Sequence, residues 1–286
     1  MRDFDENNIT DAVIDRFANT PDTRLKTVMN SLVRHLHAFV KDVEPTFDEW
    51  LFATQFLKRC GHISTGGREE FILLSDTLGV SMLVDAINHR MPAGATETTV
   101  LGPFYLDNAQ EMAQGADISM GHKGEPLYAD VEVRSAGGMP LAGATVDIWQ
   151  SDDDGFYDMQ KEGGEQYLRG RFKTDAEGRL KFWSIAPTFY PIPFDGPVGD
   201  MIQATKRHPY RPAHLHFMIA APGYETLVTH LFVAGDKYLD SDAVFGVKQS
   251  LVDEFPRRDG GTAPDGKAMT GAWRTLNYSF GLAPKD

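Results

Sequence analysis

Two pairs of histidines have the H-x-H spacing, and their local patterns distinguish them. His35 and His37 fall in a stretch with helical periodicity, where residues i and i+2 point about 200° apart, so these two side chains cannot hold one ion. His214 and His216 occur in RPAHLHFMI, which alternates as a strand does. On a strand, side chains two positions apart face the same side at a spacing of about 7 Å, so this pair could converge on one metal. The alternative is two ordinary histidines that share a strand face.

Nearby side chains with oxygen atoms indicate which metal such a site would bind. Zinc usually takes histidine, cysteine or carboxylate ligands, and two histidines with one carboxylate would indicate Fe(II). The acidic run at residues 152–155 lacks the spacing of an EF-hand loop and is expected to be a solvated turn. Tyr157 follows this turn, and Tyr190 lies in the proline-rich segment PTFYPIP. A phenolate is a hard anionic ligand that favours ferric iron, although most tyrosines in proteins are structural.

The bulk composition limits the classes of protein and partner. The chain has 286 residues, enough for one large domain or two modest ones, and its net charge of −13 argues against a nucleic-acid partner or an anionic lipid surface. No apolar stretch approaches the roughly 20 residues of a membrane span. The acidic N-terminal segment lacks the basic and apolar regions of a signal peptide. The single cysteine, Cys60, permits no internal disulfide and is expected to be a buried helix residue, and together these features predict a cytoplasmic location.

Residues 1–95 are expected to form a helical N-terminal domain. Apolar residues in the segment 25–40 recur at i, i+3, i+4 and i+7, which is the pattern of one helix face. Thr46 and Glu49 have the spacing of a capping box at the start of a second helix. Residues 68–89 form a third amphipathic stretch.

Residues 96–286 are expected to form a β-sandwich, because short alternating runs separated by turn residues replace the helical pattern. Residues 169–174 and 179–184, joined by a glycine-containing turn, are expected to form one hairpin. Residues 214–220 and 226–233 are expected to form another. The predicted fold class is therefore α+β but mainly β, with a helical N-terminal domain attached to a C-terminal β-sandwich that carries the metal site.

Four motifs occur in an order and at a spacing that resemble a known family. They are GMPLAGATVDIWQSDDDGFYD, APTFYPIPFDGPVG, RPAHLHF and VTHLFVAGD. Together with LGPFYL at residues 101–106, they resemble the successive signatures of the intradiol ring-cleavage dioxygenases. Within this family, the segments LSDTLGVSMLVDAINHR and YETLVTHLFVAGDKYLDSDAVFG look most like hydroxyquinol 1,2-dioxygenases, rather than catechol or chlorocatechol enzymes.

The resemblance implies a mononuclear non-haem Fe(III) centre, one per subunit, held by two phenolates and two imidazoles. The four ligands would be Tyr157, Tyr190, His214 and His216. It further implies that Tyr190 is displaced when substrate binds and that Arg211 is a cation of the active site. His230 stands where many catechol-cleaving members carry a glutamine, a departure shared with hydroxyquinol enzymes, and it is a third candidate catalytic residue beside Tyr190 and Arg211.

The resemblance also implies which residues surround the substrate. These positions are Leu73, Asp76, Val100, Gly102, Pro103, Phe104, Ile192, Pro193, Arg211 and Val244. For the apolar positions the alternative is plain core packing, and for Gly102 and Pro103 it is a turn. Asp76 is the candidate that recognises the third hydroxyl of hydroxyquinol, because catechol would leave a buried carboxylate unpaired. The alternative for Asp76 is an exposed helix residue or a cap.

The function implied by the resemblance is intradiol cleavage of hydroxyquinol (1,2,4-trihydroxybenzene) by O2. The product would be 3-hydroxy-cis,cis-muconate, which tautomerises to maleylacetate. One alternative is catechol or a substituted catechol as substrate, giving cis,cis-muconates, and another is a transthyretin-like binding sandwich without catalysis. The N-terminal helices carry more apolar surface than one layer needs, so a homodimer through these helices is expected. The resemblance also implies a lipid bound in the helical region.

Overall fold

The computed structural model describes residues 3–65, 68–161, 163 and 165–285. Its chain divides into two compact units, residues 1–58 and residues 59–286. The division at residue 95, which follows the change from helical to strand-like sequence, stays a prediction.

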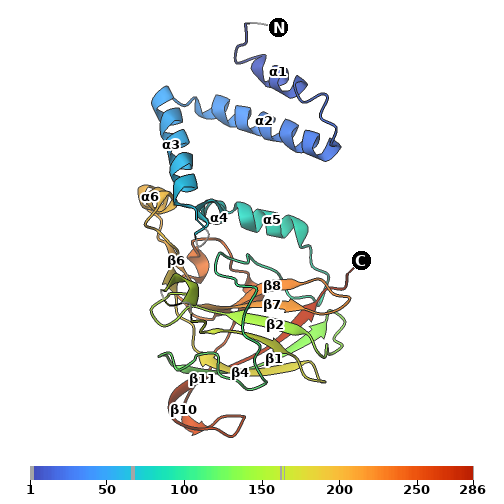
Figure 1. Ribbon diagram of the computed structural model, residues 1–286, viewed down its shortest axis with the longest axis vertical. Coiled ribbons are helices and arrows are strands. Elements are labelled where there is room, and N and C mark those ends of the chain that lie inside the picture. Colours follow the sequence, from blue (N-terminus) through green and yellow to red (C-terminus); the bar gives the residue numbers. More distant parts are fainter. Residues whose placement is uncertain (1–2, 66–67, 162, 164, 286) are drawn as a thin grey trace. The chain divides into compact units, whose positions relative to one another are not determined.

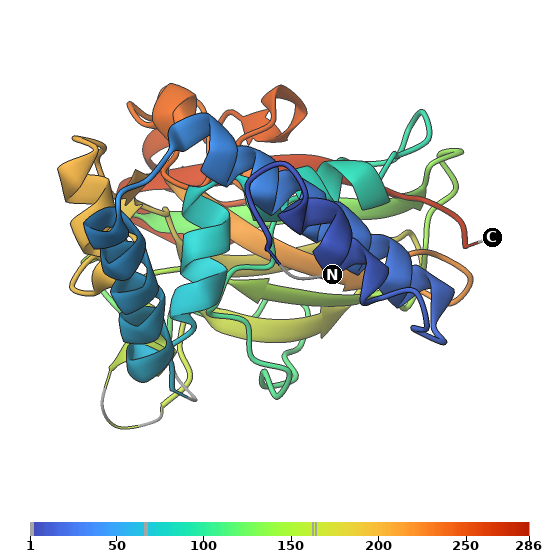
Figure 2. The same ribbon diagram turned by 90° about the horizontal axis from the view of Figure 1, so that it is seen from above.

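The first unit consists of helices. They are α1 (Ile9–Asp15), α2 (Thr23–Val43) and most of α3 (Phe47–Ile63). Helices α1 and α2 lie side by side (Figures 1 and 2). The predicted capping box is confirmed, because the Thr46 backbone N–H donates to Glu49 Oε2 at 2.8 Å and the Glu49 N–H donates to Thr46 Oγ1 at 3.3 Å.

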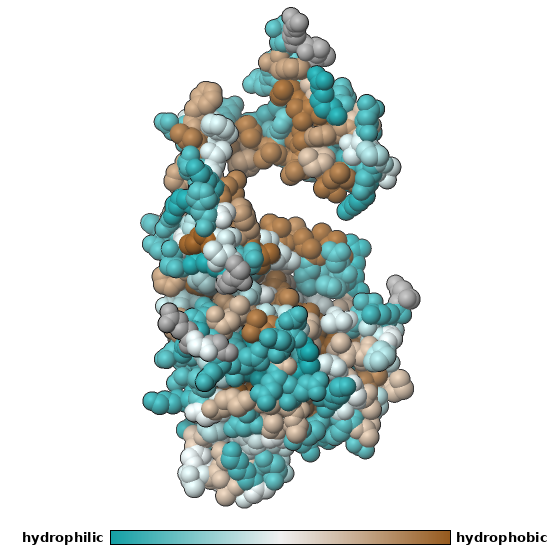
Figure 3. Space-filling model, viewed as in Figure 1, coloured by the Kyte–Doolittle hydropathy of each residue, from teal (hydrophilic) through white to brown (hydrophobic). Residues whose placement is uncertain are grey.

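The apolar face of α2 forms as predicted but is not covered within its own unit. Val33 is the one buried side chain of this helix. The apolar residues that remain exposed on α2 are Leu25, Val28, Leu32, Leu36, Phe39, Val40 and Val43. Figure 3 shows apolar side chains gathered over α2 and, in the second unit, over α5 (Val80–Asn88). A helix of this kind gains most of its stability from burying such a face, so the exposed stripe of α2 marks a surface that needs a cover.

In the described part of the second unit there are three further α-helices. They are α4 (Glu70–Thr77), α5 (Val80–Asn88) and α6 (Pro197–Ala204). The stretch predicted for residues 68–89 is therefore two helices, which separate at Gly79, where φ is 74° and glycine is favoured. Cys60 is buried in α3, as predicted. No helix in the described part of the chain is long and apolar enough to cross a membrane.

Among its described residues, the second unit also contains two larger sheets and a short ribbon (Figure 1). The four-stranded sheet has the order β10 (Arg257–Thr262), β11 (Ala268–Leu282), β1 (Pro126–Ser135), β4 (Arg179–Ile185). The five-stranded sheet has the order β3 (Arg169–Lys173), β2 (Thr145–Trp149), β7 (His214–Ala220), β8 (Leu227–Val233), β9 (Val252–Asp253). The ribbon pairs β5 (Tyr190–Pro191) with β6 (Tyr210–Arg211), and the 3₁₀ turns are η1 (Asp158–Gln160), η2 (Leu239–Ser241) and η3 (Gln249–Leu251). This architecture confirms the predicted fold class.

One of the two predicted hairpins is wrong. Strands β7 and β8 pair as a hairpin, but β3 pairs with β2 and β4 pairs with β1. The turn at residues 175–178 therefore carries the chain from one sheet to the other, and Phe172 and Phe182 meet across the core with ring centroids 5.8 Å apart. Local sequence cannot distinguish these cases, because both strands alternate and the same turn serves a hairpin or a crossing between sheets.

Strand alternation decides which side chains enter the sandwich core and which face away from it. On β7, Leu215 and Phe217 join the large buried cluster between the sheets, so His214 and His216 point to the opposite face. On β2, Ile148 enters that cluster, whereas Trp149 belongs to a separate aromatic cluster. The outer face of the five-stranded sheet therefore carries the histidines.

Candidate metal centre and substrate pocket

Four potential metal-binding atoms meet on this outer face. Tyr157 Oη lies 3.0 Å from Tyr190 Oη and 2.9 Å from His216 Nε2. His214 Nε2 lies 3.2 Å from His216 Nε2 and 3.5 Å from Tyr190 Oη. All four side chains are buried, with at most 4% of their surface exposed. The tyrosines and histidines that the sequence proposed as one ligand set are thus brought together.

The protonation of this cluster favours a bound cation. Burial lowers the pKa of His214 and of His216 well below the ordinary value, so both imidazoles are neutral at pH 7. The His214 Nδ1–H donates to the carbonyl oxygen of Pro212 at 2.6 Å, which leaves the Nε2 lone pair directed at the cluster. Burial also raises the pKa of Tyr157 well above its ordinary value, and it raises the pKa of Tyr190. Both side chains are therefore phenols at pH 7 unless a strongly positive ion binds here and stabilises their phenolate forms.

The donor set fits a metal ion of high charge. Metal–nitrogen and metal–oxygen bonds of about 2.0–2.1 Å put neighbouring ligand atoms about 3 Å apart, which is the spacing found here. Three imidazoles offer ligand atoms within 4.8 Å of one another, from His214, His216 and His230. Two phenol oxygens can add hard anionic donors. A soft or monovalent ion would not compensate the cost of burying two phenolates. These buried side chains could hold a metal, and the oxygens favour a ferric ion.

One row of the five-stranded sheet supports the histidines from the side. Four residues lie in register across β3, β2, β7 and β8, namely Arg169, Trp149, His216 and His230. The Trp149 indole stacks on the His216 imidazole, with ring centroids 4.7 Å apart and planes at 17°. The His230 ring meets His216 edge-on at 4.1 Å. His216 Nδ1 has no hydrogen-bond partner among the described residues, so stacking and edge contacts hold this ring.

Arg211 is a buried cation beside the cluster. Its Nη1 lies 3.3 Å from His214 Nε2, and its Nη2 lies 3.5 Å from His230 Nδ1. The guanidinium is held by Asp242, with Nε to Oδ1 at 3.1 Å and Nη2 to Oδ2 at 3.3 Å. Asp242 also accepts the backbone N–H of Gly246 at 2.9 Å. A Cβ on Gly246 would lie 3.0 Å from Arg211 Nη2, so the missing side chain makes room for this ion pair.

A small cavity, called the inner pocket below, adjoins Tyr190 and Arg211. Its volume is about 20 Å³. Its lining consists of Leu73, Asp76, Val100, Gly102, Pro103, Phe104, Tyr190, Ile192, Pro193, Arg211 and Val244. The ten residues predicted to surround the substrate are all among them. Asp76 is 4% exposed, so the alternative of an exposed helix residue is wrong, and burial raises the pKa of its carboxyl group.

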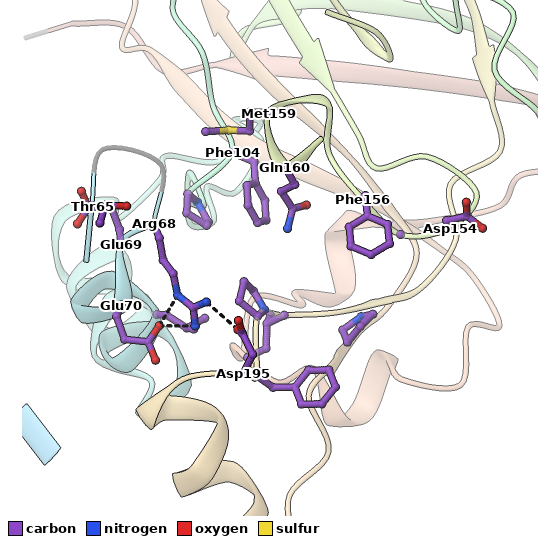
Figure 4. A pocket seen from close by; sticks show the side chains of 17 residues that line it. Thr65, Arg68, Glu69, Glu70, Phe104, Asp154, Phe156, Met159, Gln160 and Asp195 are labelled. Atoms are coloured by element: carbon purple, nitrogen blue, oxygen red, sulfur yellow. Dashed lines mark hydrogen bonds and ion pairs between the residues drawn. The ribbon is translucent and has the colours of Figure 1, made fainter. Parts of the chain in front are cut away.

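A larger cavity, called the vestibule below, opens beyond the inner pocket. It has a volume of about 600 Å³ and shares the walls Leu73, Pro103, Phe104, Ile192 and Pro193 with the inner pocket. Figure 4 shows Arg68 on one side of it, between Glu70 and Asp195. Arg68 Nη1 lies 2.7 Å from Asp195 Oδ1, and Arg68 Nη2 lies 2.9 Å from the fully buried Glu70. This ion-pair network ties the start of α4 to the segment that follows Tyr190.

Comparison with known proteins identifies the family of this site. Residues 100–283 match the family described as "Dioxygenase", and residues 22–96 match "Catechol dioxygenase N terminus". The chain belongs to the intradiol dioxygenase family. It is 53% identical to the 6-chlorohydroxyquinol 1,2-dioxygenase of Cupriavidus pinatubonensis over 92% of this chain and 95% of that protein. It is 48% identical to the hydroxyquinol 1,2-dioxygenase of a Rhizobium species over 98% of this chain and 96% of that protein.

A solved structure of the family agrees with this assignment. The hydroxyquinol 1,2-dioxygenase from Pseudomonas putida superimposes with a TM-score of 0.91 and 46% identity, and the match covers 98% of this chain and 99% of that chain. Membership of the intradiol dioxygenases supports catalysis and replaces the alternative of a transthyretin-like binding sandwich.

One sequence-based expectation for the site differs from what the structure of this intradiol dioxygenase contains, and another stays a prediction. The acidic run is not simply solvated, because Asp152 is 1% exposed while Asp153 and Asp154 are exposed. Asp152 pairs with Lys161 and accepts the backbone N–H of Phe156 at 2.9 Å, which closes the turn before Tyr157. His230 is buried beside His216 and lies outside the inner-pocket lining, and its role as a catalytic residue stays a prediction.

Several residues that support the site were missed by the sequence reasoning. Asp242 holds Arg211, Trp149 stacks on His216, and Arg169 forms a buried ion pair with Asp158. Two weak signals existed. Asp158 directly follows a candidate ligand, and Trp149 follows Ile148 on a strand, so it must face the same way as the histidines once the sheet register is known. Asp242 lies 31 residues from Arg211 and carried no local signal.

Proposed function

We propose that this intradiol dioxygenase cleaves hydroxyquinol, using one Fe(III) per subunit held by Tyr157, Tyr190, His214 and His216. The observation that carries the proposal is the meeting of two phenol oxygens and two imidazole nitrogens next to a pocket that contains one buried carboxylate, Asp76. The relatives named above for hydroxyquinol and 6-chlorohydroxyquinol support the choice of substrate.

Ferric iron at these ligands would supply Lewis acidity toward a vicinal diol and would prepare its ring for reaction with O2. The first role of the protein is to fix the tautomer and the orientation of the imidazole ligands. His214 is oriented by its bond to Pro212, and His216 is oriented by the stacked Trp149. The ring of Phe104 lies nearly flat on Tyr157, with centroids 4.4 Å apart and planes at 21°, and this contact opposes movement of the phenol.

Tyr190 is proposed as the ligand that departs. It lines the inner pocket, whereas Tyr157 does not, and a volume of about 20 Å³ holds little more than one water molecule. An aromatic ring therefore enters only if a lining side chain moves. Tyr190 would move aside to make room for the ring, and its Oη, as the displaced phenolate, would take a proton from one hydroxyl of the substrate.

Arg211 is proposed to stabilise negative charge on the substrate. Its guanidinium is 4% exposed and faces the inner pocket, and Asp242 fixes its plane. A preorganised cation in a dry site contributes far more than one in water. The apolar walls that Leu73, Ile192 and Val244 supply exclude water from the reacting ring.

Asp76 is proposed to select hydroxyquinol over catechol. Its carboxylate would accept a hydrogen bond from the third hydroxyl of hydroxyquinol, whereas catechol has no hydroxyl at that position. The expected product is 3-hydroxy-cis,cis-muconate, which tautomerises to maleylacetate. His230 is proposed to act as a neighbour of Arg211 and His216 rather than by touching the substrate.

The test is oxygen uptake by the purified protein with hydroxyquinol and with catechol, with mass-spectrometric identification of the products. We expect faster turnover of hydroxyquinol and a wine-red protein, because tyrosinate-to-Fe(III) charge transfer absorbs visible light. Equal or greater efficiency with catechol would refute the substrate assignment. A protein that is colourless, free of iron and not coloured by added iron would refute the metal centre.

The uncovered face of α2 supports a homodimer with a lipid at its helices. The exposed side chains of Leu32, Leu36, Phe39 and Val43 recur at helical spacing, so a second copy of the helices, or acyl chains between them, would remove this stripe from water. Static light scattering tests the dimer, and lipid extraction with mass spectrometry tests the lipid. The cytoplasmic location stays a prediction from the sequence.

A further inference from the structure

A buried ion pair lies beside Tyr157 and has no part in the chemistry proposed above. Arg169 and Asp158 are 3% and 4% exposed. The guanidinium binds the carboxylate with two parallel bonds, Nε to Oδ2 at 2.9 Å and Nη2 to Oδ1 at 2.5 Å. Such fork-like pairs have a fixed geometry, unlike a lysine contact.

Arg169 also binds the segment on the other side of Tyr157. Its Nη2 donates to the carbonyl oxygen of Phe104 at 2.9 Å. The ring of Phe104 is the one that stacks on Tyr157, and Asp158 is the next residue of the chain after Tyr157. One guanidinium therefore connects the backbone that carries the tyrosine to the backbone that carries the ring stacked on it.

Stability alone is a weak reason for this pair. Removing two charges from water costs several kcal/mol, and apolar replacements of buried ion pairs are often neutral or stabilising. The pair does have a geometric consequence, because Arg169 is fixed by its register opposite Trp149, which stacks on His216. Arg169 thus links the segment of Tyr157 to the same sheet that carries the histidines.

We propose that Arg169, through Asp158 and Phe104, is a positioning residue that holds the phenol oxygen of Tyr157 at the metal. This inference rests on the proposed iron site and adds a residue to which no role has been given. The side chain touches neither substrate nor metal, and it acts by limiting where Tyr157 Oη can lie relative to His216 Nε2, 2.9 Å away.

The test compares two ion pairs of the same strand. The double variant R169M/D158L removes the proposed pair without leaving an unpaired charge, and R169K keeps the charge but loses the fork. The matched control is R171M/D147L, because Arg171 and Asp147 form a similar two-bond pair, at 2.5 and 2.7 Å, two residues further along β3. Their other hydrogen bonds join Tyr105 and the carbonyl oxygen of Asp107, and not Asp158 or the carbonyl oxygen of Phe104. The readouts are Fe(III) affinity by competition with a chelator, the tyrosinate charge-transfer band, and thermal melting of the metal-free protein.

We expect R169M/D158L and R169K to bind Fe(III) about 10- to 100-fold more weakly and to shift the charge-transfer band, as is usual when a group that orients a metal ligand is lost. The control should match the wild type in both. Unchanged iron affinity and an unchanged band in R169K would overturn the proposal. So would an equal loss of affinity and melting temperature in the control pair, since that would indicate a general effect on the fold. A colourless, iron-free wild type would instead refute the metal centre itself.

Discussion

Replacing Asp76 with alanine should separate the two candidate substrates. The carboxylate is 4% exposed in a pocket whose other walls are mostly apolar, so no water competes for the third hydroxyl of the substrate. A hydrogen bond to a charged group contributes about 1.5–3 kcal/mol. At about 1.4 kcal/mol per tenfold change, the loss corresponds to a fall of about 10- to 150-fold in kcat/KM for hydroxyquinol.

Catechol should behave differently in the same variant. It has no third hydroxyl, so Asp76→Ala removes no hydrogen bond to this substrate and kcat/KM should stay constant or rise. The assay is oxygen uptake with both substrates on the same preparation, reported as the ratio of the two kcat/KM values. Asp85→Asn is a suitable control, because Asp85 is a buried carboxylate of α5 that pairs with Lys248 and does not line the inner pocket. A ratio in Asp76→Ala within about threefold of the wild type would refute the role of Asp76.

The pKa of Asp76 adds a pH dependence with a defined sign. Burial raises this pKa above its ordinary 3.8, so the carboxylate form is lost at a higher pH than usual. The preference for hydroxyquinol should therefore decline as the pH falls through that raised pKa, whereas the preference of Asp76→Asn should be flat. Because ionisation of Asp76 weakens the folded state as the pH rises through the same pKa, Asp76→Asn should melt no lower than the wild type at pH 7. A flat ratio in the wild type would contradict this reasoning.

Three further outcomes follow from the site and the helices. Asp242→Asn should lower kcat/KM by a similar factor, about 10- to 100-fold, for both substrates, because it loosens Arg211 rather than a substituent-specific contact; a selective loss on hydroxyquinol would contradict this. Tyr157→Phe should change the charge-transfer band and weaken iron binding, as judged by visible absorption and metal analysis, and retention of both would exclude Tyr157 as a ligand. Leu36→Glu should convert the proposed dimer to a monomer in light scattering, because the substitution places a charge in the exposed apolar stripe, and an unchanged dimer mass would place the interface elsewhere.

The histidine pair shows how far sequence reasoning reaches. Alternation on β7 places His214 and His216 on one face, and this follows from strand geometry before any relative is considered. The tyrosines could not be found this way. Tyr157 and Tyr190 approach His216 and His214 only after a turn, a 3₁₀ segment and a two-stranded ribbon have brought them there, so their selection depended on the resemblance.

Residues that act on other residues were harder to predict. Arg169 works through the register of β3 against β2, and the sequence-based hairpin had assigned this strand to the wrong partner. Asp242 reaches Arg211 from a segment of turns that has no periodicity to interpret. The face of α2 was predicted as a helix face, and the excess of apolar surface on the N-terminal helices led to the expected homodimer. Which residues of α2 would stay exposed could not be predicted, because a periodic apolar pattern does not show which segment covers it.

The size of the inner pocket bears on how fast the enzyme can meet its substrate. A cavity of about 20 Å³ admits no aromatic ring while Tyr190 stays in its lining, although the vestibule outside is roomy enough to hold one. The arrival of substrate in the vestibule and its entry into the inner pocket are then separate steps, and only the rate of the first depends on the substrate concentration. At high substrate concentration the observed rate of capture would level off at the rate of the internal rearrangement, which the proposed departure of Tyr190 assigns to a side-chain movement and not to diffusion.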